Sequence, residues 1–211
     1  MAVSYSLSAR AARQLKRAPA GDGILPVVLE RWSPLSFDSR EVKPDDLKRV
    51  FEAARWAPSS YNEQPWRFIV GQHGSDTFQR IVSTLTAGNQ AWATRAPALI
   101  LSVAKRTFSR NNAPNHHALF DLGAASAMIT LQATALGLAT HQMAGFDHDV
   151  ARKILEIPED CAMGSVMALG YQADPSALPN EKLIASETGQ RTRKSLREVV
   201  FSTWGQPAKL E

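Results

Sequence analysis

The sequence predicts a domain of the α/β or α+β class, in which a mixed sheet of about four to five strands is flanked by helices. Helix and strand patterns alternate irregularly along the 211 residues, with no internal repeat and no change of composition that would divide them. A chain of this length can form one substantial core. We therefore expect residues 1–211 to fold as a single domain, with residues 1–29 as an N-terminal helical extension and residues 201–211 as a C-terminal arm.

Four apolar segments make up the predicted sheet. The segment at 97–105, PALILSVAK, is a continuous apolar run, which is typical of a strand buried on both faces. Three more segments have the length and apolar character of strands, and a short fifth strand is expected at the end of QRTRKSLREVVF. The three are WRFIVGQ from Trp66, ATHQMAGF from Ala139 and MGSVMALGY from Met163.

Helical patterns lie between the strands. Pro44 fits the first turn of one helix, where Asp45 and Asp46 place negative charge that the helix dipole favours. The longest pattern, from Ala118 to Leu138, is apolar nearly all round, so it predicts either a central core helix or a subunit interface. A further helix is expected near the N-terminus, over residues 5–17.

The composition limits the classes of function. Hydrophobic residues make up 44% and charged residues 21%, which is ordinary for a soluble globular protein. No apolar run approaches the roughly 18 residues of a membrane span. The net charge of +4 comes without a basic stripe interleaved with aromatic residues, so nucleic-acid binding is not favoured, whereas anionic ligands such as phosphates are. The single cysteine, Cys161, excludes an internal disulfide and favours a cytoplasmic protein.

Motifs of several enzyme classes are absent from the sequence. It contains no nucleophile elbow, no Walker A loop, no HExxH motif and no GxGxxG motif. His116 and His117 are adjacent, but no acidic residue or cysteine accompanies them at the spacing of a metal site. We therefore expect no metal centre, and no pattern identifies a catalytic triad.

A dense polar loop lies between the end of one helix and the strand that starts at Trp66. Pro58 and Pro65 bound this loop, and the six residues between them, SSYNEQ, concentrate hydroxyl and amide groups. Such a loop suits a planar polar ligand. Serine, asparagine and proline are also common in turns, so a turn without a ligand is the alternative.

Two basic segments lie far from this loop in the sequence. RWS at 31–33 and RTRK at 191–194 supply guanidinium groups, which bind phosphate in a bidentate manner. A solvated surface charge is the alternative for a lone arginine such as Arg31. Together with the loop at 58–64, the two segments offer a phosphate site at one end and hydrogen-bonding groups for a heterocycle at the other. That combination describes flavin mononucleotide (FMN).

Several segments, taken in chain order, resemble those of a known family. RWSPLSFD comes first, ARWAPSSYNEQPWRFIV second and NQAWATRAPALIL third, and GFD at 145–147 and RTRKSLREVV from Arg191 follow. From Glu30 to Gly205 the sequence resembles the nitroreductase family, whose members use FMN to reduce nitroaromatics and quinones. The resemblance implies a nitroreductase-like fold and an intertwined homodimer with FMN at the interface.

The resemblance also implies which residues contact FMN. The first basic segment should meet the phosphate and the ribityl chain, and the C-terminal arginines should meet the phosphate. The polar loop should line the isoalloxazine ring, with Ser59 and Ser60 contributed across the dimer interface. A backbone N–H of Ala144 or Gly145 should point at flavin N5. The implied contacts are Arg31, Trp32, Ser33, Leu35, Pro58, Ser59, Ser60, Asn62, Gln64, Gln142, Met143, Ala144, Gly145, Arg191 and Arg193.

In the implied reaction NAD(P)H reduces the flavin, and an electron acceptor such as a nitroaromatic or a quinone then takes the electrons at the same face, by a ping-pong mechanism. The chemistry belongs to the cofactor, so no side chain has to act as a nucleophile. Four residues are candidates for the substrate pocket, and core or interface packing is an equal alternative for the two aromatic ones. The four are Asn89, Trp92, His117 and Phe120.

Two positions depart from the family pattern. Leu35 stands where several members have a basic residue near flavin N1, and Ala144 stands where members often have an acid. Both changes alter the charge around the ring. They leave open a flavoenzyme of the same fold with another reaction (an oxidase, a dehydrogenase or a reductive dehalogenase), and a flavin-binding protein without turnover.

Overall fold

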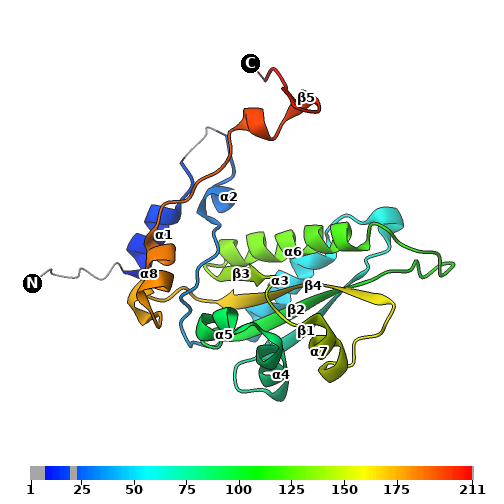
Figure 1. Ribbon diagram of the computed structural model, residues 1–211, viewed down its shortest axis with the longest axis horizontal. Helices are drawn as coiled ribbons and strands as arrows, with labels where there is room; N and C mark the ends of the chain where they lie inside the picture. The colour runs from blue at the N-terminus through cyan, green and yellow to red at the C-terminus, as the bar shows by residue number, and fades with distance from the viewer. Residues whose placement is uncertain (1–7, 20–22, 211) are drawn as a thin grey trace, which may run out of the picture.

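Four antiparallel strands form the central sheet of the computed structural model, which describes residues 8–19 and 23–210 (Figure 1). The order across the sheet is β1-β2-β4-β3. The strands are β1 (Trp66–Gln72), β2 (Ala98–Lys105), β3 (Ala139–Met143) and β4 (Cys161–Gly170). Each strand runs antiparallel to its neighbours.

The α+β class is confirmed, whereas the mixed pairing predicted for the sheet is not found among the described strands. Alternating helices and strands favour parallel pairs joined by helical crossovers. Strands β2 and β3 do point the same way, and α6 (Ala118–Ala135) connects them. However, β4 lies between the two and pairs with both in the antiparallel sense.

Helices cover both faces of the sheet. Side chains of β2 alternate between the faces, as the pleat requires, so that Leu99 and Leu101 pack in one core cluster and Ile100 in another. Helices α3 (Pro44–Arg55) and α6 cover the face of Ile100. The opposite face is covered by α4 (Asp76–Thr84), α5 (Ala87–Ala93) and α7 (His148–Ile154) (Figure 1).

Local signals set the ends of several helices. Pro44 is the first residue of α3, as predicted, with Asp45 and Asp46 in the first turn. The Asp147 carboxylate accepts the N–H of Val150 at 2.9 Å and so caps α7. The sequence pattern does not predict α5 or α8 (Glu181–Thr188), because both helices are short and have no strong apolar stripe.

The N-terminal extension lies beside one end of the sheet, next to α8, whereas the C-terminal arm projects away from the sheet (Figure 1). The described part of the extension contains α1 (Ala9–Lys16) and α2 (Pro26–Glu30), and α8 packs against α1. Residues 5–7 of the helix predicted there lie outside the described residues. The arm contains the expected last strand, β5 (Phe201–Thr203), which pairs with β6 (Gln206–Pro207).

Helix α6 is a core helix with one uncovered apolar face. By length and composition alone it could cross a membrane, but Leu122, Ile129 and Ala133 are buried against the sheet. The other side is open, with Phe120 79% exposed and Ala127 also exposed. The sequence left open a core helix or an interface helix. Since one face of α6 is buried and the other is exposed, α6 can be both.

Candidate functional site

A cavity of about 240 Å³ lies where α1, α8 and the start of β3 meet. We call it the cation pocket, because four cationic side chains line it: Lys16, Arg31, Arg191 and Arg193. The other lining residues are Trp32, Ser33, Leu35, His141, Ser186 and Glu187. The fold thus brings together the two basic segments from opposite ends of the sequence.

The cation pocket has an excess of positive charge. Burial and the neighbouring Arg193 lower the pKa of Arg31, and burial together with Arg31 and Arg193 lowers the pKa of Arg191. Among the described residues of the lining, Glu187 is the one carboxylate. It is 1% exposed, and its two oxygens accept successive backbone N–H groups at 2.7 and 3.3 Å. Cations placed this close together disfavour their own charged forms unless an anion joins them, so the pocket suits a ligand with more than one negative charge.

Three contacts fix residues 31–37, which form one wall of the pocket. The backbone N–H groups held by Glu187 are those of Leu35 and Ser36. On the other side, Nδ1 of His141 on β3 donates to the Pro34 carbonyl at 3.0 Å. Burial lowers the pKa of His141 despite this hydrogen bond, so the ring is neutral at pH 7. Trp32, within the segment, is itself buried.

The polar loop, residues 58–64, has an unusual backbone. Tyr61, Asn62 and Gln64 have φ angles of +52°, +57° and +52°, which are uncommon for residues other than glycine. The N–H of Ser60 donates to Oδ2 of Asp121, a buried residue in the first turn of α6, at 3.1 Å. The loop is thus held against the N-terminal end of α6. Pro58, Asn62 and Gln64 are exposed, and Ser59 and Ser60 are half-buried.

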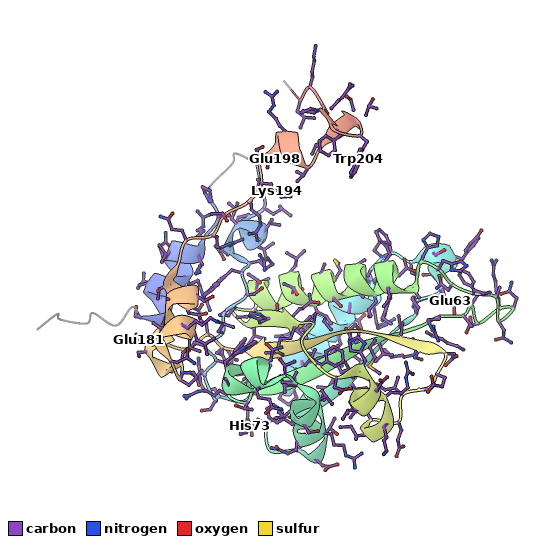
Figure 2. All side chains as sticks on the ribbon, in the orientation of Figure 1. Glu63, His73, Glu181, Lys194, Glu198 and Trp204 are labelled. Carbon is purple, nitrogen blue, oxygen red and sulfur yellow. The ribbon has the colours of Figure 1, made fainter. Side chains whose placement is uncertain are left out.

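Within one chain, the polar loop and the cation pocket lie at opposite ends of α6. Ser60 contacts the first turn of the helix, whereas Trp32 lies beside Leu138, just beyond its last turn. A helix of 18 residues is about 27 Å long. Figure 2 shows the same separation, with Glu63 of the polar loop at one end of the molecule and Glu181 of α8 at the other. One chain therefore does not bring the two predicted halves of the site together.

The segment 142–145 continues β3 past its last residue. Gly145 is closely packed, since a Cβ there would lie 2.7 Å from Nδ2 of Asn89. The Gly145 carbonyl accepts hydrogen bonds from this Nδ2 at 2.9 Å and from the N–H of Thr86 at 3.0 Å. Among the described residues, the N–H groups of Ala144 and Gly145 have no acceptor. Gln142 is exposed and Met143 is buried.

The four residues predicted for the substrate pocket occupy three different places. Trp92 is 2% exposed and stacks on Phe37, with ring centroids 6.2 Å apart, so its surroundings support core packing rather than a substrate contact. Asn89 supports the segment 142–145. His117 and Phe120 are exposed at the N-terminal end of α6, near the polar loop.

Comparison with known proteins identifies the family. The model of the nitroreductase family matches residues 28–82 and 71–171. The chain belongs to the nitroreductase family. An uncharacterised 15.4 kDa protein of Mycolicibacterium smegmatis is 34% identical over 150 residues, which cover 67% of this chain and 99% of that protein. An NADH dehydrogenase of Thermus thermophilus is 27% identical over 191 residues, covering 74% of this chain and 92% of that enzyme.

Solved structures of nitroreductase relatives confirm the predicted fold. One is described as an oxidoreductase containing FMN. It is 32% identical with a TM-score of 0.81, and the alignment covers 88% of this chain and 94% of the relative. A nitroreductase family protein of Clostridium difficile is 25% identical with a TM-score of 0.64, covering 83% and 95%.

Half of the cation pocket lies outside the region that the nitroreductase model matches. Lys16 precedes residue 28, and Ser186, Glu187, Arg191 and Arg193 follow residue 171. Sequence reasoning misses four of the lining residues. Ser186 and Glu187 belong to a helix that the sequence does not predict, His141 resembles any strand residue, and Lys16 resembles any basic residue of an amphipathic helix. The four are Lys16, His141, Ser186 and Glu187.

Proposed function

We propose that this protein is an FMN-dependent oxidoreductase that transfers electrons from NAD(P)H to a nitroaromatic, a quinone or a similar small-molecule acceptor. The observation that carries the proposal is the cation pocket, in which Arg31 and Ser33 meet Arg191 and Arg193. Membership of the nitroreductase family supports it, as does the relative of similar fold that contains FMN.

The chemistry of the pocket fits the phosphate of FMN. A phosphate monoester carries about −1.5 to −2 charges at pH 7 and has three acceptor oxygens. Guanidinium groups bind such a group with paired hydrogen bonds, and the pocket provides three of them with one carboxylate that is already engaged. Arg31 also donates to the Ser33 hydroxyl at 3.4 Å, which places that hydroxyl beside the same anion.

The segment 142–145 is the part of this chain that we assign to the isoalloxazine ring. Its two N–H groups without an acceptor, at Ala144 and Gly145, are the candidates to meet flavin N5. The Asn89 amide and the N–H of Thr86 fix the Gly145 carbonyl, so the two N–H groups are held in place before any ligand binds. We also assign Gln142 and Met143, in the same segment, to contacts with the ring.

A homodimer would complete the site. The polar loop is too far from the cation pocket of its own chain to share one cofactor, so Ser59, Ser60 and the rest of the loop must serve the ring bound by a partner chain. The uncovered apolar face of α6 and the exposed arm, where Trp204 is 92% exposed, are the surfaces that such a partner would bury.

When bound, FMN would supply the redox chemistry, namely hydride acceptance from NAD(P)H and electron donation to the acceptor. The residues of this chain bind the phosphate, orient the ring and present backbone donors to it. No side chain has to act as a nucleophile. The single cysteine is compatible with a reducing compartment, and we place the reaction in the cytoplasm.

The visible absorption spectrum of the purified protein tests the proposal. We expect flavin bands, intrinsic or gained on addition of FMN, that bleach under anaerobic addition of NADPH or NADH. A protein that retains no flavin after incubation with FMN would refute the cofactor. Flavin that is retained but not reduced would identify a flavin-binding protein without turnover.

Leu35 and Ala144 make a second reaction on the same cofactor worth testing, because neither can place a charge beside the ring. After anaerobic reduction, a panel of nitroaromatics, quinones, halogenated aromatics and oxygen separates the candidates. Fast reoxidation by nitroaromatics or quinones supports the proposed activity. Fast reoxidation by oxygen alone indicates an oxidase, and release of halide indicates a reductive dehalogenase.

A further inference from the structure

We propose that Lys16, on the N-terminal helix α1, binds the phosphate end of the cofactor, so that the extension completes an anion site to which the matched family region contributes only part. The proposed function supplies only the identity of the anion. The site itself follows from the contacts of Lys16.

Lys16 is buried, and no acid among the described residues forms an ion pair with it. The residue is 5% exposed, its Nζ donates to the Ser186 carbonyl at 2.9 Å, and Nζ lies 5.2 Å from the centre of the Trp32 ring. A lysine ammonium has three N–H donors, and the described residues provide an acceptor for one of them. Fully buried lysines are rare unless paired, so an anion in the pocket would supply what the chain lacks.

The charges around Lys16 also favour binding of an anion. Burial lowers its pKa, Glu187 raises it and Arg191 lowers it again. Both oxygens of Glu187 already accept backbone N–H groups, and no carboxylate lies within ion-pair distance of Nζ among the described residues. Among the described residues, the pocket therefore sets an ammonium and three guanidinium groups against a single carboxylate, Glu187.

The fold fixes Lys16 before the anion arrives. Arg191 donates to the Lys16 carbonyl at 2.6 Å, and Arg13 on the same helix donates to the Gly137 carbonyl at 3.4 Å. Helix α1 is thus tied to the basic segment at 191–194 and to the turn that precedes β3. Because the side chain is already ordered, its use in binding costs little further entropy.

Lys16 should distinguish FMN from riboflavin, which has the same ring and ribityl chain but no phosphate. A hydrogen bond to a charged group is worth about 10- to 100-fold in affinity. Loss of the ammonium should therefore weaken FMN binding by that factor and leave riboflavin binding within about twofold of the wild-type value. A purely structural role for Lys16 would weaken both ligands equally.

The experiment titrates the full-length protein, stripped of flavin, with FMN and with riboflavin and follows flavin fluorescence. K16M keeps an unbranched side chain without charge and should lose only FMN affinity. K16R keeps the charge and should retain most of the preference for FMN. K182M removes an exposed lysine of α8 that does not line the pocket, and it should change neither affinity.

Two results would overturn the proposal: wild-type FMN affinity in K16M, or equal losses for FMN and riboflavin.

Thermal melting with inorganic phosphate distinguishes a failure of the role proposed for Lys16 from a failure of the proposed flavin function. If phosphate stabilises the wild type but not K16M while no flavin binds, Lys16 is an anion-binding residue and the flavin assignment fails. If neither phosphate nor flavin binds, both fail. If K16M does not fold, K16Q replaces it in both flavin titrations: a loss confined to FMN supports the role of Lys16, whereas equal losses or no loss refute it.

Discussion

Replacement of Asp121 by alanine should release the polar loop from α6. The Asp121 carboxylate is 4% exposed and accepts the N–H of Ser60 at 3.1 Å. This contact holds a loop in which Tyr61, Asn62 and Gln64 all have positive φ angles. Such a backbone persists only when its surroundings enforce it, so the loop should lose its conformation when the contact is removed.

The size of the effect follows from two contributions. A hydrogen bond to a buried carboxylate contributes about 1.5–3 kcal/mol. Asp121 also lies in the first turn of α6, where its charge adds about 0.3–1 kcal/mol through the helix dipole. D121A should therefore lower the free energy of unfolding by about 2–4 kcal/mol. D121N keeps an oxygen acceptor and should lose less.

Denaturant titration and flavin titration check the two consequences separately. Because the loop is assigned to the ring rather than to the phosphate, D121A should weaken FMN and riboflavin by the same factor, unlike K16M. D149A is the matched control, since Asp149 is an exposed acid in the first turn of α7 and has only the dipole contribution to lose. An unchanged unfolding free energy in D121A, or a loss confined to FMN, would refute this account of the loop.

Three further changes test other parts of the structure. Burial raises the pKa of Glu187 above its unfolded value of 4.5. Its contribution to stability is therefore full below pH 4.5 and is lost as the pH rises through the folded-state pKa. The unfolding free energy of the wild type relative to E187Q should fall over that range, and a constant difference in denaturant titrations contradicts the raised pKa. In G145A the new Cβ would lie 2.7 Å from Nδ2 of Asn89. This overpacking should lower the free energy of unfolding by about 1–3 kcal/mol, which a thermal melt detects as a lower melting temperature. The visible spectrum of bound flavin should also shift. Unchanged values would mean that this segment is not tightly packed. W92A should lower the unfolding free energy by about 3–5 kcal/mol because the ring is in the core, and a loss below about 1 kcal/mol would contradict that position.

The fold class and the strand positions could be predicted because they depend on local patterns. The apolar run at 97–105 is buried as predicted, with Ala98 to Ala104 all inaccessible. Pro44 and Asp147 mark helix starts through the same short-range chemistry that the structure shows. The order of the strands depends on long-range pairing, so the insertion of β4 between β2 and β3 could not be predicted from the sequence.

The candidate site was predictable only where a motif carries it. Arg31 and Arg191 stand in recognisable segments, and the structure places both in one pocket. Lys16 and Glu187 have no motif: their importance arises from burial and from neighbours far away in the sequence. The separation of the polar loop from the pocket is likewise a property of the tertiary structure, set by the length of α6.

Sedimentation velocity recorded at the visible absorption band of flavin tests the central claim most directly, because it reports cofactor and assembly together. We expect FMN to sediment with the protein at the mass of a homodimer. Flavin that sediments as a free small molecule, or with a monomer, would contradict a site built from the cation pocket of one chain and the polar loop of another.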